Sequence, residues 1–390
     1  MPPEEATERV SPGKPFPIIT YNLPYEKACA RHIKASLKRS RPFIIISRSL
    51  SRETDAVERL SNALSQNGGQ VAGVHKGMQP HTLFSEVLQI SQEVKDSGAD
   101  SIITVGGGSL VDGAKTIVFA IANDVDTHEK LDSLLKTAEP RGDQPPGATE
   151  LKPSTMPIMS VTTTLSAGEH NPHGGATNDR TKFKYLFEDP VGIGPRVIVL
   201  DPRLTVTAPE RVWLSTGMRA VDHCVESVCS SKPHPEGTKA ALKGLCLLIP
   251  ALLRSKEDPK DLEARLNAQR GTAESMKPYV YYDVPLVQKY NAKTNGAQQQ
   301  IILDALWSDP VVARVFEQHG LVKGKADLGD ALDTVIRALG LPRKLNEYNI
   351  APKDLDAIAE NSRKDACCKK NPIPLVEKDQ VLEILRSCLD

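Results

Sequence analysis

The chain has 390 residues, of which 39% are hydrophobic, 25% charged and 4% aromatic, a composition typical of a soluble globular protein with an aliphatic core. Its 49 Lys and Arg residues balance its 49 Asp and Glu residues, which argues against a nucleic-acid or anionic-membrane partner. No apolar run approaches the roughly 20 residues of a transmembrane helix, and the polar, acidic N-terminus is unlike a signal peptide. The 7 cysteines contain no CxxC pair, so reduced thiols and a cytoplasmic location are expected.

Strands and helices are predicted to alternate in the first half of the chain, after an irregular, proline-rich leader over residues 1–20. Apolar runs of strand length alternate with segments in which apolar residues recur at helical spacing. The strands are expected at 41–47, 70–75, 101–105, 158–161 and 196–200, and the helices at 54–66, 82–97 and 110–122. This alternation predicts an α/β domain with a parallel sheet.

The second half of the chain is predicted to be helical. The strand signal fades after Asp201, and helices are expected at 211–230, 237–254 and 326–339. Residues 124–156 are polar and are expected to form an exposed excursion from the first half. The predicted domains are therefore an α/β dinucleotide-binding domain over 1–205 and an all-helical substrate domain over 206–390.

A glycine-rich turn is the strongest local feature of the sequence. Residues 106–115 read GGGSLVDGAK, and they follow a buried strand and open a helix. Glycines let a ligand approach the backbone closely, and a helix N-terminus offers N–H groups and a positive dipole end to phosphate. The run is neither GxGxxG nor a P-loop, and a simple tight turn is the alternative. Three consecutive glycines favour phosphate binding.

A threonine-rich segment follows the strand at 158–161. Residues 161–170 read VTTTLSAGEH. Hydroxyl groups at the carboxyl end of a parallel strand lie where open α/β sheets bind ligands. The alternative is a loop whose hydroxyls bond to their own backbone.

Together these segments resemble the iron-containing alcohol dehydrogenase family, within the dehydroquinate-synthase-like fold. GGGSLVDGAK is similar to that family's pyrophosphate-binding motif, TTTLSAGEHN to its TT-x-x-S/T-x-x-E loop, and VIVLDPRLTVTAPE to its strand followed by a DP turn. The TTLS form is closest to the maleylacetate reductase branch.

The resemblance implies a set of cofactor-binding residues. It places the pyrophosphate at Gly106, Gly107, Gly108 and Ser109, with further contacts from Asp112, Thr162, Thr163, Ser166 and Lys184. Ser47 falls where many members carry an acid that selects NAD(H) over NADP(H). Here residues 47–49 are Ser-Arg-Ser and include no acid, so the sequence is compatible with either NAD(H) or NADP(H) as the cofactor.

The family's metal-ligand set is incomplete in this chain. The segment TGMRAVDHCVES is similar to a family helix in which an Asp and a His four residues apart bind the metal. His223 is retained, but Arg219 stands at the carboxylate position, and a guanidinium cannot bind a cation. The family's His-rich segment is missing around residues 270–284, before the matching stretch at 284–291. We therefore expect no metal site, although the family implies iron or zinc.

Three residues are candidates for catalysis: His223, Arg219 and His173. Without a metal, Arg219 would stabilise the developing alkoxide or clamp a substrate carboxylate, and His223 would act as the acid. Arg219 could instead pair with Glu226 or face solvent. His170 and His173 lack a third ligand for a metal, and His173 could face the substrate or relay a proton.

These residues predict an NAD(P)-dependent oxidoreductase that acts on a small carbonyl, enone or alcohol by hydride transfer and without a metal. The alternatives are a catalytically impaired homologue that binds the dinucleotide only, and a sugar-phosphate lyase of the same fold, which would need a metal. No nucleic acid or membrane partner is expected, and a homodimer is compatible with the sequence.

Overall fold

The computed structural model describes residues 6–9, 16–138, 151–188, 192–230, 232–282, 295–362 and 374–389. The stretch at 284–291, which was matched to the family in the sequence, lies outside these residues. The chain divides into two compact units, 1–208 and 209–390, and each is described by itself.

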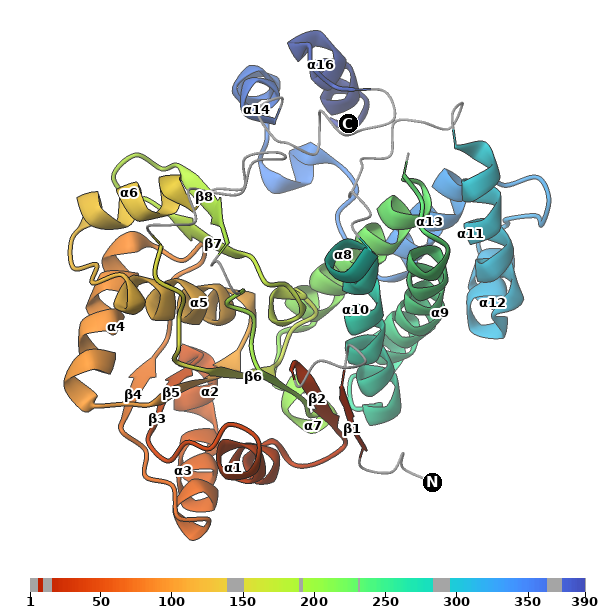
Figure 1. Ribbon diagram of the computed structural model, residues 1–390. Coiled ribbons are helices and arrows are strands. Elements are labelled where there is room, and N and C mark those ends of the chain that lie inside the picture. Colours follow the sequence, from red (N-terminus) through yellow and green to blue (C-terminus); the bar gives the residue numbers. More distant parts are fainter. Residues whose placement is uncertain are drawn as a thin grey trace. The chain divides into compact units, whose positions relative to one another are not determined.

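The first unit is built on a seven-stranded sheet of order β1-β2-β9-β6-β5-β3-β4 (Figure 1). All neighbouring strands pair in parallel except β1 and β2, which are antiparallel. Its strands are β1 (Ala6–Arg9), β2 (Ile18–Tyr21), β3 (Pro42–Ile46), β4 (Gly73–Lys76), β5 (Ser101–Gly106), β6 (Ile158–Thr162) and β9 (Val197–Leu200), with a separate hairpin of β7 (Gly174–Thr177) and β8 (Lys184–Phe187). The predicted α/β class with a parallel sheet is confirmed.

Helices cover both faces of this sheet because its strands are buried on both sides. In β3, Phe43 and Ile45 join one core, while Ile44 and Ile46 join the other, as the two-residue period of a strand requires. The helices of this unit are α1 (Tyr25–Ala35), α2 (Arg48–Glu53), α3 (Ala56–Gln66), α4 (Phe84–Ser97), α5 (Gly108–Ala122), α6 (His128–Thr137) and α7 (Pro202–Thr205). Residues of α4, α5 and α6 lie in the first core, and residues of α1, α2 and α3 lie in the second.

Three sequence predictions in this unit were wrong. The leader over 1–20 contains β1 and the start of β2, which add two strands to the sheet edge. The excursion over 124–156 contains α6, whose Leu131, Leu134 and Leu135 are buried. The β7–β8 hairpin was not predicted, because its glycines and its short alternation give a weak strand signal.

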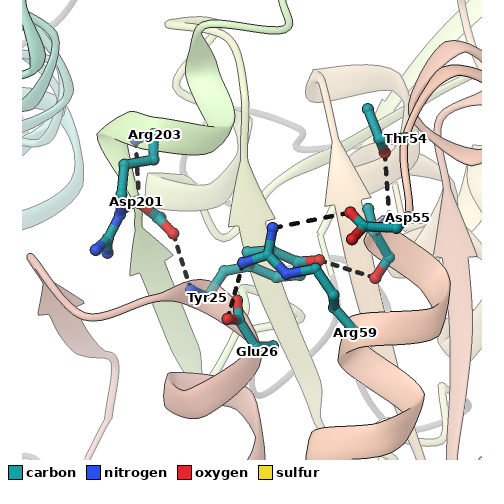
Figure 2. Close-up of polar contacts among 8 residues, drawn as sticks. Tyr25, Glu26, Thr54, Asp55, Arg59, Asp201 and Arg203 are labelled. Carbon is teal, nitrogen blue, oxygen red and sulfur yellow. Dashed lines mark hydrogen bonds and ion pairs between the residues drawn. The ribbon is translucent and has the colours of Figure 1, made fainter.

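Polar contacts connect the DP turn after β9 to helices α1 and α3, on the face of the sheet that carries the second core (Figure 2). The Asp201 carboxylate accepts hydrogen bonds from the Arg203 backbone N–H at 3.1 Å and from the Tyr25 N–H at 2.9 Å, so it caps α7 and receives the start of α1. The Tyr25 hydroxyl donates to the Ala56 carbonyl at 2.8 Å, and Arg59 pairs with Glu26 at 2.8 Å. This motif therefore has a structural role in joining β9, α1 and α3.

The described part of the second unit contains helices and no strand. They are α8 (Glu210–Val228), α9 (Pro235–Glu257), α10 (Leu262–Tyr282), α11 (Gly296–Ser308), α12 (Pro310–Gln318), α13 (Leu328–Ala338), α14 (Leu355–Ser362) and α16 (Lys378–Ser387), with short 3-10 turns at Leu345–Tyr348 and Pro352–Asp354. Helices α9 and α10 approach closely at Gly244 and Gly271, where a Cβ on Gly271 would lie 3.2 Å from the Gly244 carbonyl oxygen. The predicted helical class of this half is confirmed. No described helix is both long enough and apolar enough to cross a bilayer.

Candidate cofactor site

The glycine-rich turn lies between β5 and the N-terminus of α5, as predicted. Gly106 has a φ of +154°, a conformation that side-chain-bearing residues rarely adopt. Gly107 is the N-cap of α5, and no side chain caps the helix there. The first N–H groups of a helix lack intrahelical partners, so this end of α5 offers donors to an anion.

Hydroxyl-bearing side chains surround the three glycines. A Cβ on Gly106 would lie 3.1 Å from Ser47 Cβ, one on Gly107 would lie 3.2 Å from Thr164 Cγ2, and one on Gly108 would lie 3.0 Å from Ser166 Cβ. The hydroxyls of Thr164 and Ser166 are hydrogen bonded to each other at 3.0 Å. Glycine at these positions lets the turn pack against this cluster of hydroxyls.

The structure brings most of the predicted cofactor residues to this turn. Ser47 follows β3 as the N-cap of α2, and its N–H donates to the Val105 carbonyl at 2.9 Å. The Thr163 N–H donates to the Gly106 carbonyl at 3.0 Å, and Thr162 pairs with Gly106 in the sheet. These contacts place the two motifs side by side at the carboxyl ends of β5 and β6.

Two charged residues stand beside the turn. A Cβ on Gly175 would lie 3.5 Å from Asp112 Oδ2 and 3.6 Å from Lys184 Nζ, so the carboxylate and the ammonium both lie over Gly175 of the β7–β8 hairpin. Asp112 also lies 3.7 Å from a Cβ on Gly168. The predicted Asp112 and Lys184 therefore both lie next to Gly175 of β7.

Sequence reasoning missed Thr164, the residue after the predicted Thr162 and Thr163. Thr162 and Thr163 are buried, whereas the side chain of the partly exposed Thr164 contacts the glycine turn. Three consecutive threonines do not reveal which side chain faces the turn. Strand alternation gives no signal here, because β6 ends at Thr162 and residues 163–166 are irregular.

His173 is held within its own loop. Its Nδ1 lies 2.8 Å from Asn171 Oδ1, and its Nε2 lies 3.3 Å from Glu188 Oε2. The interaction with His173 holds the pKa of the Glu188 carboxyl below its ordinary value. His170 Nε2 lies 3.5 Å from the buried Glu169 carboxylate.

Arg219 and His223 belong to α8 in the second unit. Arg219 is exposed and His223 is buried. Burial, together with the positive charge of Arg219, lowers the pKa of His223 from 6.5 to about 4. Its Nδ1 has no hydrogen-bond partner in the described part of the protein. His223 is therefore a neutral imidazole near pH 7, so very little of the imidazolium that would act as the acid is present.

In the described part of the chain, the residues around His223 do not make up a transition-metal site. Within the described residues, no three His, Cys, Asp or Glu side chains gather as metal ligands. Such a site needs three or four ligands, and the residue one turn before His223 is Arg219.

Comparisons with known proteins match nearly the whole chain. A family model described as "Iron-containing alcohol dehydrogenase" matches residues 22–202, and one for "Fe-containing alcohol dehydrogenase family, C-terminal" matches residues 280–389. The dehydrogenase FUM7 of Gibberella moniliformis is 34% identical, over 95% of this chain and 95% of its own. Maleylacetate reductase 1 of Cupriavidus pinatubonensis is 24% identical, over 82% and 81% of the two chains. The crystal structure of maleylacetate reductase from Agrobacterium tumefaciens superposes with a TM-score of 0.66 at 22% identity and covers 95% of both chains.

Proposed function

The chain belongs to the iron-containing alcohol dehydrogenase family and is an alcohol dehydrogenase-like oxidoreductase, and on that premise we propose that it uses NADPH to reduce a small carbonyl or enone, or NADP⁺ to oxidise the matching alcohol. The observation that carries the proposal is the cradle of glycines and hydroxyls at the N-terminus of α5. The nicotinamide cofactor supplies or accepts the hydride when it is bound.

The cradle fits a pyrophosphate. Gly107 and Gly108 let Thr164 and Ser166 pack directly against the turn, so their hydroxyls lie beside the N–H groups that open α5. Asp112 and Lys184 stand at the side of the turn, where we propose that they orient the rest of the cofactor.

A basic edge beside Ser47 supports a preference for NADP(H). Ser47 carries no charge that would repel a 2′-phosphate, and the next residue is the exposed Arg48. The Arg48 side chain lies over Gly77, since a Cβ there would be 2.9 Å from its Nε. Lys76, which is exposed, pairs in the sheet with Ile46, the residue before Ser47. The two cations therefore flank the strand end where a ribose 2′-phosphate would bind.

For the substrate, we propose that Arg219 stabilises the developing alkoxide and that neutral His223 contributes a hydrogen bond. A guanidinium keeps its charge at any physiological pH, so it can act without a proton transfer. His173 is proposed as a proton carrier, because its ring lies between Asn171 and the partly exposed carboxylate of Glu188.

We propose that this chemistry proceeds without a resident metal. Arg219 replaces the carboxylate ligand, and the described residues around His223 supply no other ligand set. No step of the proposed reaction is assigned to iron or zinc. The cytoplasmic location and the homodimer stay predictions from the sequence.

The test is a titration of the purified protein with NADH and NADPH, followed by fluorescence, together with oxidation of both cofactors against a panel of carbonyls and enones. We expect NADPH to bind at least as tightly as NADH and at least one carbonyl to be reduced. Elemental analysis of the same sample should find far less than one iron or zinc per chain. A preference for NADH above about 100-fold, roughly 2.7 kcal/mol, would contradict the role of the basic edge. Binding without turnover of any substrate would favour an impaired homologue.

A further inference from the structure

Lys115 on α5 is a fully buried cation that the proposed reaction does not use. Its side chain has no exposed surface, and its Nζ donates to the backbone carbonyls of Gly168 at 2.7 Å, Asn171 at 2.8 Å and His173 at 2.6 Å. An ammonium group has three N–H donors, so these carbonyls use all of them. A neutral amine has two donors and would leave one carbonyl without its bond.

The surroundings of Lys115 compensate its charge. Asp112 Oδ1 lies 3.6 Å from Nζ, and the buried Glu169 carboxylate also interacts with it electrostatically. Burial lowers the pKa of the Lys115 ammonium, while both acids oppose that shift. A buried charge is tolerated when it is paired and hydrogen bonded, as it is here.

The carbonyls that Lys115 holds belong to the segment 168–173, which joins two parts of the cofactor site. Thr164 and Ser166, which contact Gly107 and Gly108, immediately precede this segment, and β7 with Gly175 follows it. Lys115 is itself two turns along the helix that the glycine turn opens. One side chain therefore joins the helix under the glycine turn to the loop that covers that turn.

We propose that Lys115 is a positioning residue for the cofactor, whose ammonium ties the segment 168–173 to α5 and so holds Thr164 and Ser166 against the Gly107–Gly108 turn. The same group orients Asp112, its neighbour at 3.6 Å, toward Gly168 and Gly175. This inference rests on the proposed function, since it assumes that the turn binds a dinucleotide.

The experiment compares Lys115→Met with Ile117→Ala in the full chain. Methionine has a similar length and fills the buried space, but it donates no hydrogen bond. Ile117 is fully buried in the core on the same helix, so its truncation reports the effect of destabilising α5 alone. For each protein, the dissociation constants of NADPH and NADH, the thermal midpoint and the hydrogen exchange of the 163–177 peptides are measured.

We expect Lys115→Met to weaken binding of NADPH by about 10-fold or more, with faster hydrogen exchange confined to 163–177. Ile117→Ala should bind NADPH with an affinity within about two-fold of the wild type, even if its thermal midpoint falls as much as that of Lys115→Met. In any variant that turns over, the KM for the cofactor should rise more than kcat falls.

Three results would overturn the inference. One is a Lys115→Met protein that binds NADPH within about two-fold of the wild type, and another is an equal loss of affinity in Ile117→Ala. The third, a wild type that binds neither cofactor, would overturn the proposed function as well. If Lys115→Met does not accumulate as folded protein, Lys115→Gln replaces it under the same criteria, because the amide keeps two N–H donors without the charge.

Discussion

Glu169 offers a sharp test of the electrostatics beneath the cofactor site. Its side chain is 3% exposed, and burial raises the pKa of its carboxyl from 4.5 to about 7, although Lys115 and Thr162 act in the opposite direction. Between these two pH values, the folded protein keeps a proton that the unfolded chain has lost. The contribution of Glu169 to the free energy of unfolding is therefore highest below pH 4.5 and falls as the pH rises toward 7.

The size of the effect follows from the width of that interval. A shift of one pKa unit corresponds to about 1.4 kcal/mol, so ionisation of Glu169 should cost the folded state about 3 kcal/mol in total. Most of this loss should occur between about pH 5 and 8. Glu169→Gln keeps the shape of the side chain and cannot ionise. Its stability relative to the wild type should therefore rise by about 2 to 3 kcal/mol over that range.

The assay is urea unfolding of the cofactor-free protein, followed by far-ultraviolet circular dichroism at several pH values. Glu129→Gln is the control, because hydrogen bonds from its own backbone and from the always-charged Arg180 lower the pKa of the exposed Glu129 carboxyl. The Glu129→Gln difference should stay flat over the same interval. A flat difference for Glu169→Gln, or equal slopes for both variants, would show that Glu169 ionises as an ordinary surface carboxyl does.

Three further predictions concern the glycine turn and α8. Gly107→Val should raise the dissociation constant of NADPH at least about 100-fold, because its Cβ would already lie 3.2 Å from Thr164 Cγ2; unchanged affinity in a fluorescence titration would refute the pyrophosphate assignment. His223→Gln should reduce the destabilisation of the protein in acid by up to about 3 kcal/mol between pH 6.5 and about 4, since His223 must gain a proton on unfolding there; unfolding curves at both ends of the range would check it. Arg219→Ala should lower kcat/KM by about 100-fold and Arg219→Lys by less, whereas normal turnover with a lower thermal midpoint would assign Arg219 a structural role.

The sequence predicted the central sheet well because its strands are short apolar runs separated by amphipathic helices. It failed at the sheet edge, where β1 and β2 lie in a proline-rich stretch: β2 pairs with the distant β9, and β1 pairs with β2. Pairing with a distant strand leaves no local signal, so a segment with weak strand propensity can still join a sheet. The β7–β8 hairpin was missed for another reason, since its glycines and its short alternation give a weak strand signal.

The position of the glycine-rich turn was predicted because its signal is local. Glycines between a strand and a helix can be recognised in one segment of sequence. Sequence reasoning missed Thr164, the residue whose side chain contacts Gly107. The direction of a side chain in a loop depends on backbone angles that three identical residues do not reveal.

Lys115 shows why the rest of the site escaped prediction. Its three partners are backbone carbonyls 53 to 58 residues away. Every residue has a backbone carbonyl, so no sequence motif can mark the ones that bind Lys115. Side-chain motifs identify the groups that touch a ligand, whereas the groups that hold them in place bind the backbone. The Lys115 contacts and the packing of the glycines against Thr164 and Ser166 join this part of the site through the fold itself. The affinity of the site for a cofactor should therefore depend on the anchoring lysine as strongly as on the hydroxyls that it positions.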